Sequence, residues 1–270
     1  MTLGEVLRGA AEYLERKGVD SPRLDAELIL AHALGLTRLE LYTHHDRRVS
    51  DEERAAARAL VERRGRREPL AYVLREWGFR SLTLRTDARA LVPRPETEIV
   101  VDRALARLGR VESPRVVDVG TGSGAIALSI AAERPDARVT ATDASPEALS
   151  LARENAEKLS LDVELVETDL IDGLAGPFDL VVSNPPYVLP GEELEPELAY
   201  EPRAALIDEG QTRALAEAAR GVLDGWLVLE CHEARAADVA AMLVELGYGE
   251  TAVTRDLAGR DRVVEARWTP

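Results

Sequence analysis

The sequence has a single cysteine and lacks any apolar run long enough to cross a membrane. Cys231 alone can form neither an intramolecular disulfide nor a cysteine zinc cage, which fits a reducing compartment. A membrane-spanning helix needs about 18 or more consecutive apolar residues, and no such run occurs. The amphipathic, charged N-terminal segment also lacks the apolar core of a signal peptide. We therefore expect a cytoplasmic protein that does not bind membranes.

Positive charge is scarce as well. The 270 residues include 34 Lys and Arg against 49 Asp and Glu, for a formal net charge of -15 at pH 7. A field of this sign repels a phosphate backbone and disfavours broad nucleic-acid binding. The acidic excess lies beyond residue 76, because residues 1–76 hold 14 basic and 14 acidic residues.

The neutral first part carries one basic cluster, the sequence RRGRRE. A solvated helix end would produce such a pattern, and so would a docking patch for an acidic partner. Both interpretations stay open at this point. The arginines concerned are Arg63, Arg64, Arg66 and Arg67.

Hydrophobic periodicity predicts a helical domain over residues 1–72 and a β-hairpin linker over 73–92. Apolar residues from Leu3 to Leu14 recur at helical spacing, and alternation with polar residues begins near Trp77. The predicted helix boundaries are Ser21-Pro22 and Gly35 for one helix, and the Ser50–Glu53 capping box and Gly65 for the next.

Residues 93–270 alternate between predicted strands and helices, which is typical of a parallel sheet covered on both faces. We expect helices over 124–133 and 145–158, with Ser145 capping the second. The predicted strands are 115–119, 138–142, 162–167, 178–183, 226–230, 249–255 and 262–267.

A glycine-rich turn follows the first of these strands. Glycines permit close backbone approach to a ligand, and the N–H groups of the following helix favour a negative group. The spacing also satisfies the dinucleotide pattern G-x-G-x-x-A, and a plain turn without a ligand is the alternative. The turn comprises Gly120, Thr121, Gly122, Ser123 and Gly124.

Two aspartates end the next strands. Asp143 could accept hydrogen bonds from a ribose diol, as in dinucleotide enzymes and methyltransferases alike, or could cap the helix at Ser145. Asp169 could accept from an adenine amino group or be a solvated loop residue.

The segment SNPPY separates these alternatives. Two prolines without N–H groups form a rigid corner after a buried strand, at the same end of the sheet as the glycine turn. The side-chain oxygen of Asn184 and the carbonyl of Pro185 could accept both N–H bonds of a planar NH₂ group, with Tyr187 as a wall. Such a corner suits methyl transfer to a conjugated nitrogen and serves no purpose in an NAD enzyme.

At these residues the chain resembles the HemK/PrmC family of release-factor glutamine methyltransferases. The resemblance spans nearly the whole chain and is most specific in VPRPETE and EPRAAL. The matching segments are LDAELILAHALG (24–35), REPLAYVL (67–74), LVPRPETE (91–98), VVDVGTGSGAIAL (116–128), SNPPY (183–187), EPRAAL (201–206) and RDLAGRDRVV (255–264).

The resemblance implies a fold and an activity. The fold is α/β, a seven-stranded Rossmann-like class I methyltransferase domain over residues 93–270 preceded by the helical domain and the hairpin. The cofactor is S-adenosylmethionine, which leaves as S-adenosylhomocysteine. The substrate is the glutamine of the Gly-Gly-Gln motif in class 1 peptide-chain release factors, methylated on its side-chain amide nitrogen. We expect a monomer that forms no stable complex with nucleic acid.

The resemblance also assigns roles to residues. Asn184, Pro185, Pro186 and Tyr187 hold the glutamine amide, and Asn184 also contacts the cofactor. Glu201 and Arg203 shape the substrate mouth, and the helical domain grips the release factor. The cofactor residues are Gly120 to Gly124, Asp143, Asp169, Leu170, Arg94 and Glu96.

Two positions depart from the family pattern. Leu170 stands where relatives often have an aromatic residue, and His232 stands at a usual glycine position. Cys231 and His232 together lack the remaining ligands of a metal site, so no metal is expected. The alternative functions are a DNA or RNA base-amino methyltransferase and a non-catalytic S-adenosylmethionine-binding module.

Overall fold

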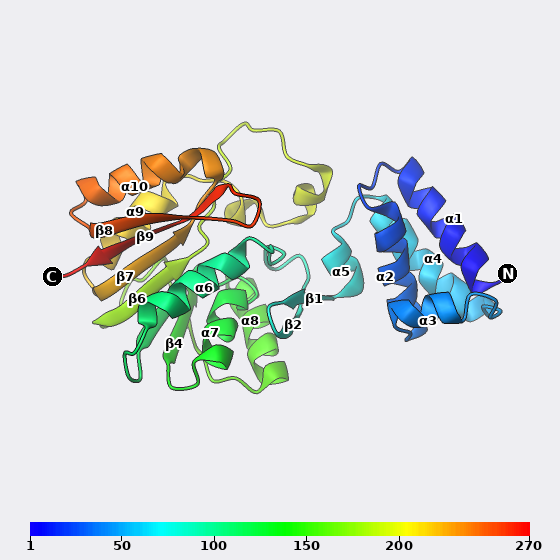
Figure 1. Ribbon diagram of the computed structural model, residues 1–270, viewed down its shortest axis with the longest axis horizontal. Helices are drawn as coiled ribbons and strands as arrows, with labels where there is room; N and C mark the ends of the chain where they lie inside the picture. Colours follow the sequence, from blue (N-terminus) through cyan, green and yellow to red (C-terminus); the bar gives the residue numbers. More distant parts are fainter. The chain divides into compact units, whose positions relative to one another are not determined.

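The computed structural model describes residues 1–270, and the chain forms two compact units. The first comprises Met1–Glu76 together with Leu194–Tyr200, and the second comprises Trp77–Glu193 and Glu201–Pro270. Helices make up the first unit, whereas strands and helices alternate in the second (Figure 1). The domain boundaries expected near residues 72 and 92 stay predictions. None of the helices combines the length and apolarity that crossing a membrane requires.

Five helices form the first unit. Ser50 and Glu53 make the predicted capping box, with the Glu53 N–H 3.2 Å from Ser50 Oγ and the Ser50 N–H 2.9 Å from Glu53 Oε2. Pro22 begins a helix as predicted, but the Ser21 side chain makes no capping bond, because its ψ of 60° departs from the extended form of a cap. The helices are α1 (Leu3–Arg16), α2 (Pro22–Leu34), α3 (Arg38–Thr43), α4 (Asp51–Gly65) and α5 (Leu70–Leu74).

The two glycines expected to end helices act differently. Gly35 follows α2 in the left-handed region, with φ 63°, as predicted. Gly65 is the last residue of α4, and its φ is not in the left-handed region. A Cβ on Gly65 would lie 2.4 Å from Cε1 of Tyr13. The absence of a side chain at Gly65 allows α1 to pack closely against α4, and no turn requires a glycine there.

Two arginines of the basic cluster bind a loop that joins this unit from far along the chain. Arg64 is 7% exposed, and it contacts Asp25 at 2.7 Å and Glu197 at 2.9 Å. Arg67 binds the same Glu197 with Nε at 2.7 Å. Glu197 lies in the 3-10 turn η1 (Pro196–Tyr200). The ionic contacts therefore hold Leu194–Tyr200 in the first unit.

The other two arginines complete this arrangement. Arg63 pairs with Glu68, and the backbone carbonyl of Arg66 accepts the hydroxyl proton of Tyr200 at 2.7 Å. Three of the four guanidinium groups thus contact carboxylates of this chain, and only the Arg66 side chain makes no such contact. The interpretation as a solvated helix end is wrong for Arg64, which is buried against Asp25.

A seven-stranded sheet organises the second unit, in the order β5-β4-β3-β6-β7-β9-β8. The first five of these strands are parallel, whereas β9 runs antiparallel to both neighbours. The expected seven-stranded class I methyltransferase fold is therefore confirmed, with a sheet that is parallel over five strands and mixed at this edge. The strands are β3 (Arg115–Val119), β4 (Arg138–Asp143), β5 (Glu164–Glu167), β6 (Phe178–Ser183), β7 (Leu223–Glu230), β8 (Gly249–Arg255) and β9 (Asp261–Trp268).

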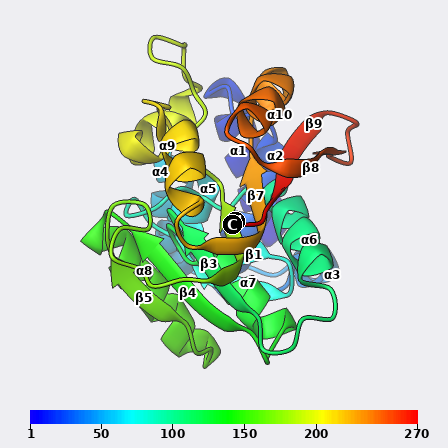
Figure 2. The ribbon, with the colours of Figure 1, turned by 90° about the vertical axis from the view of Figure 1, so that its left-hand side faces the viewer.

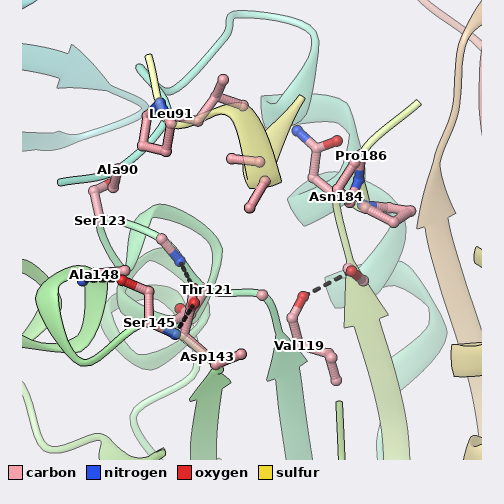
Figure 3. Close-up of a pocket in the computed structure, with 18 of the residues that line it drawn as sticks. Ala90, Leu91, Val119, Thr121, Ser123, Asp143, Ser145, Ala148, Asn184 and Pro186 are labelled. Atoms are coloured by element: carbon pink, nitrogen blue, oxygen red, sulfur yellow. Dashed lines mark hydrogen bonds between the residues drawn. The ribbon is translucent and has the colours of Figure 1, made fainter. Parts of the chain in front are cut away.

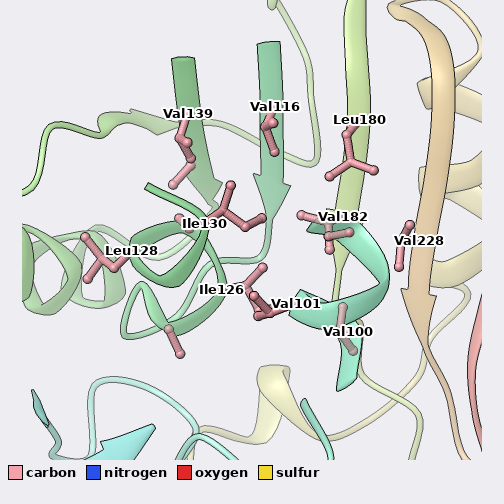
Figure 4. Close-up of a cluster of buried hydrophobic side chains, with 14 of the residues drawn as sticks. Val100, Val101, Val116, Ile126, Leu128, Ile130, Val139, Leu180, Val182 and Val228 are labelled. Carbon is pink, nitrogen blue, oxygen red and sulfur yellow. The ribbon is translucent and has the colours of Figure 1, made fainter. Parts of the chain in front are cut away.

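Helices cover both faces of this sheet (Figure 2). Alternate strand residues point to opposite faces, so Val116 and Val182 pack with α6 and α7, whereas Val117 and Val181 pack with α9 and α10. Figure 4 shows the first of these two cores. The helices are α6 (Thr97–Leu108), α7 (Ala125–Glu133), α8 (Pro146–Leu159), α9 (Gln211–Ala219) and α10 (Ala236–Glu245), with short turns η2 (Arg203–Ala205) and η3 (Glu233–Arg235).

The predicted hairpin forms from β1 (Glu76–Phe79) and β2 (Leu82–Arg85). Its apolar residues Phe79 and Leu84 are 1% and 0% exposed within the core that contains α6 and α7. The hairpin therefore connects the helical segment to the rest of the chain and also packs into the hydrophobic core of the second unit.

A steric test of the sheet compares two strand glycines. A Cβ on Gly225 of β7 would lie 2.1 Å from the carbonyl oxygen of Asp179, whereas a Cβ on Gly249 of β8 would meet nothing within 4 Å. We expect Gly225→Ala to lower the free energy of unfolding by about 1–3 kcal/mol, because the parallel β6–β7 pair must separate. Gly249→Ala should leave it unchanged within about 0.5 kcal/mol. Urea denaturation of both variants measures this, and equal stabilities would contradict the strand pairing described.

Candidate active site

A cavity of about 420 Å³ opens at the carboxyl ends of β3, β4 and β6 (Figure 3). Its volume lies in the range of small-molecule and cofactor sites. The walls come from the segment before α6, the loops that follow the three strands, the short turn η2 and the start of α9. They include Ala90, Arg94, Thr97, the turn 119–123, Asp143, Asp169, Leu170, Asn184, Pro185, Pro186 and Ala205.

The glycine turn lines the floor of this cavity in a fixed conformation. Gly120, Gly122 and Gly124 have φ of 69°, 58° and 85°, which side chains with a Cβ rarely adopt. The Thr121 N–H donates to the carbonyl of Thr142 at 2.9 Å and so ties the turn to β4. The predicted turn therefore presents its backbone to the cavity through a conformation that needs glycine.

Asp118 of β3 holds the same turn in place through hydrogen bonds, and this role was not predicted from the sequence. Its Oδ2 accepts from the Thr121 hydroxyl at 2.6 Å and from the Ala127 N–H at 3.1 Å. Complete burial raises the pKa of this carboxyl to about 7. The available signal was an acidic residue among the valines of this strand, two positions before Gly120.

Asp143 is the last residue of β4 and bridges the turn to the next helix. Its Oδ2 accepts from the Gly122 N–H and its Oδ1 from the Ser145 N–H, each at 2.9 Å. Ser145 caps α8 as predicted, through the Ala148 N–H at 3.1 Å (Figure 3). An ionised carboxylate offers about four lone-pair sites, so two acceptor sites remain for a ligand in the cavity.

Asp169 and Leu170 line the neighbouring wall. Asp169 is exposed, and Leu170 has φ 50°, with its carbonyl oxygen accepting from Thr142 Oγ1 at 2.7 Å. The backbone of Leu170 is thereby fixed, and its aliphatic side chain packs against the core that contains α9 and α10. Their expected contacts with an adenine ring stay predictions.

The SNPPY corner lies beside the glycine turn because β3 and β6 pair, with Val119 opposite Ser183. Ser183 at the end of β6 donates to the Val119 carbonyl of β3 at 2.7 Å (Figure 3). Asn184 then lines the cavity, with Nδ2 donating to Thr97 Oγ1 at 3.2 Å. The Asn184 Oδ1 makes no hydrogen bond within the chain, so an acceptor without a partner lies beside the cavity, next to Pro185 and Pro186.

Tyr187 lies outside the cavity wall. Burial raises the pKa of its phenol to about 12, so it stays protonated at neutral pH. Its ring centroid is 6.3 Å from that of His232. His232, at the position expected to hold glycine, accepts from the Ala234 N–H at 3.2 Å and begins the turn η3.

Two of the four further predicted site residues lie at or directly behind the cavity wall, and the other two lie away from it. Arg94 lines the cavity, and Glu201 is buried behind it, accepting from Arg94 and from the Val92 N–H at 2.9 Å. Glu96 faces Arg260 at 3.3 Å instead of the cavity. Arg203 is exposed, and its side chain makes no hydrogen bond or ion pair. Glu201 therefore fixes the segment that contains Val92 and Arg94, and it does not line the entrance of the cavity.

No group of three or more His, Cys, Asp or Glu side chains in residues 1–270 is placed to hold a metal ion. Cys231 is buried, and burial raises the pKa of its thiol to about 12, which leaves it a protonated thiol. Neither Cys231 nor His232 lines the cavity.

The cavity fits an adenosine-type cofactor next to an amide substrate. The free acceptor sites of Asp143 suit a ribose diol, and the glycine turn leaves room because nothing lies within 4 Å of a Cβ built on Gly120. The free oxygen of Asn184 suits a planar NH₂ group at the far end. Together these groups can aim a neutral nitrogen at an electrophile held in the cavity.

Comparisons with known proteins agree with this geometry. Residues 5–74 match the PrmC N-terminal domain, and residues 98–222 match the methyltransferase small domain. A release factor glutamine methyltransferase of Deinococcus radiodurans is 46% identical over 99% of this chain and 99% of its own length. One from Rhodopirellula baltica is 41% identical over 97% of this chain and 95% of its own.

A solved structure supports the fold of the second unit. The ribosomal protein L11 methylase of Lactobacillus delbrueckii subsp. bulgaricus has a TM-score of 0.50 and 25% identity, over 66% of this chain and 81% of its own. The near full-length relatives and both domain matches lead to one conclusion. The chain belongs to the PrmC/HemK family of release factor glutamine methyltransferases, which depend on S-adenosylmethionine.

Proposed function

We propose that this chain methylates the side-chain amide nitrogen of the glutamine in the Gly-Gly-Gln motif of class 1 peptide-chain release factors. The observation that carries the proposal is the unpaired Asn184 oxygen at the end of the cavity, next to two prolines that contribute no competing N–H. Relatives of nearly the same length are release factor glutamine methyltransferases.

The difficulty of the reaction lies in the nucleophile. The lone pair of an amide nitrogen is delocalised, as the rotation barrier of about 18–20 kcal/mol in peptides indicates. Asn184 Oδ1 and the Pro185 carbonyl would accept its two N–H bonds and hold the nitrogen facing the cofactor. Both acceptors would also stabilise the positive charge that develops on nitrogen as the new C–N bond forms.

The cofactor supplies an electrophilic methyl group when it is bound. The residues proposed to hold it are the glycine turn 120–124, Asp143, Asp169, Leu170 and Arg94. Asp143 would accept the ribose hydroxyl protons, since both of its present partners are backbone N–H groups that leave two acceptor sites. Glu96 and Arg203 lie off the cavity wall, and a role for them would have to be indirect.

We further propose that the protein acts in the cytoplasm as a monomer, since its proposed substrate is a translation factor. The helical first unit would bind the release factor away from the reacting atoms. Its arginine cluster is largely engaged by Asp25, Glu68 and Glu197, so its remaining surface would make that contact.

The proposed substrate is tested by methyl transfer from labelled S-adenosylmethionine. Purified release factor, release factor with glutamine replaced by alanine in its Gly-Gly-Gln motif, duplex DNA and ribosomal RNA are assayed in parallel. We expect label on release factor only, and none on the alanine control. Label on nucleic acid alone would identify a base-amino methyltransferase, and bound cofactor without transfer to any of these would favour a non-catalytic module.

Replacing the free acceptor tests the mechanism. We expect Asn184→Ala to lower kcat by about a hundredfold to a thousandfold, the effect of removing one preorganised polar group from a transition state. Cofactor affinity should change much less, and the melting temperature should stay close to that of the native protein because the side chain fills no core volume. Turnover within about twofold of native would contradict the role of Asn184 as an acceptor.

Replacing Asp143 tests the ribose contact. We expect Asp143→Ala to raise the dissociation constant of S-adenosylmethionine by about tenfold or more, the effect of losing a hydrogen bond to a charged group. Asp162→Ala is the matched control, because Asp162 is exposed and its side chain makes no hydrogen bond or ion pair. Isothermal titration calorimetry compares the two variants, and equal affinities would remove Asp143 from the cofactor site.

A further inference from the structure

A buried carboxylate lies behind the Asn184 amide, and Thr97 connects the two. Thr97 Oγ1 donates to Glu230 Oε2 at 2.7 Å, and Asn184 Nδ2 donates to Thr97 Oγ1 at 3.2 Å. Glu230, the last residue of β7, is 1% exposed, and Thr97, the first residue of α6, is 4% exposed. Residues from β7, α6 and the end of β6 thus form one hydrogen-bonded row that ends at the cavity.

The chemistry of the row fixes its direction. A carboxylate can only accept hydrogen bonds, so the Thr97 hydroxyl proton points at Glu230. The lone pairs of the hydroxyl then face Asn184, whose amide must present its NH₂ group to them. The Asn184 oxygen therefore points the other way, and it is the atom without a partner in the chain.

We propose that Glu230 is a positioning residue, which acts through Thr97 to hold the Asn184 amide with its oxygen toward the substrate nitrogen. Glu230 does not line the cavity, so it has no contact with the reacting atoms. The inference rests on the proposed function for the identity of the substrate, but the orientation of the amide is a property of this chain alone. Hydrogen bonds in a row polarise one another, which makes the Asn184 oxygen a stronger acceptor.

Protonation of Glu230 removes this control. A carboxylic acid carries an O–H donor, which can donate to Thr97 Oγ1. The Thr97 proton is then free to point at Asn184, whose amide can turn its oxygen inward and its NH₂ group toward the cavity. Two NH₂ groups that face each other form no hydrogen bond, so the substrate amide loses its acceptor.

Charged groups of both signs surround Glu230. Two arginines favour its carboxylate, whereas burial and a neighbouring carboxylate favour the acid. Burial is the largest effect and raises the pKa of Glu230 to about 7. The Oε1 atom is buried without a hydrogen-bond partner, which agrees with a poorly stabilised carboxylate. The facing groups are Arg94 and Glu96 from the loop before α6, Tyr187 from the loop after β6, Cys231 directly after β7, and Arg262 from β9.

The kinetic test compares Glu230→Gln with Glu265→Gln. Glu265 is an equally buried glutamate on β9 that pairs with Arg103 and Arg107, away from the cavity. Methylation of release factor is measured at saturating cofactor from about pH 6 to pH 9. We expect Glu230→Gln to lower kcat by about tenfold to a hundredfold, as for other residues that orient a site from behind. Its affinity for S-adenosylmethionine should stay within about twofold of native.

The pH profile separates positioning from a structural role. The native kcat should fall on the acid side with a midpoint near the pKa of Glu230, about 7. This fall should be absent in Glu230→Gln and present in Glu265→Gln. Thr97→Val should behave like Glu230→Gln, and Thr97→Ser should restore a large part of kcat because it keeps the hydroxyl. A Glu230→Gln variant with native kcat and a native acid limb would overturn the proposal.

A second measurement does not depend on the substrate. The sequence has only three carboxamide side chains, Asn155, Asn184 and Gln211, so their NH₂ signals in a ¹⁵N-labelled sample are easily assigned by substitution. We expect the Asn184 pair to shift with a midpoint near pH 7 in the native protein and to lose this shift in Glu230→Gln. An Asn184 pair that does not titrate would overturn the proposal. A titrating pair without methylation of release factor would instead refute the proposed function.

Discussion

The parallel pairing of β3 with β6 is the constraint on which the rest of the site depends. Val119 pairs with Ser183, so the glycine turn and the SNPPY corner leave the sheet at the same edge and at the same level. The Ser183 hydroxyl strengthens this register by donating to the Val119 carbonyl. A slip of one residue would turn the side chains of one strand to the opposite face and separate the glycine turn from the SNPPY corner.

Asp118 and Glu230 lie buried near this edge of the sheet, where their negative charges are unfavourable. Burial raises the pKa of Asp118 and of Glu230 to about 7, and each has one oxygen without a partner. Because these values lie above the ordinary carboxyl range, the folded state binds more protons than the unfolded state between about pH 4.5 and pH 7. Their contribution to stability is therefore full in acid and is lost as the pH rises through 7.

Glu265 shows that burial alone does not have this result. It is as inaccessible to solvent as Glu230, yet Arg103 and Arg107 bind its two oxygens, and the pKa of its carboxyl is lowered despite the opposing effect of burial. The difference lies in the partners that each site provides. Glu230 accepts a hydrogen bond from the Thr97 hydroxyl and none from a guanidinium, so its charge can orient Thr97.

Local sequence patterns predicted what local physics determines. Periodicity located β3, β4 and β6, and the glycines and prolines located the turns that line the cavity. The antiparallel β8–β9 pair was predictable too, because only a short turn separates those strands and a parallel crossover needs a dozen or more residues. The link from Thr97 to Glu230 spans 133 residues and has no local pattern, and the same holds for the link from Arg64 to Glu197.

Positioning by Glu230 and the chemistry of an amide substrate fit together in one further respect. Two acceptors, the Asn184 oxygen and the Pro185 carbonyl, require a partner with two N–H donors on the same atom. A glutamate carboxylate in the same position would face them with lone pairs only, and the repulsion would reject it. An Asn184 amide that could turn would lose this discrimination, since its NH₂ group accommodates a carboxylate oxygen. Under the proposed function, a fixed amide direction would therefore serve selectivity for glutamine as much as the rate of transfer.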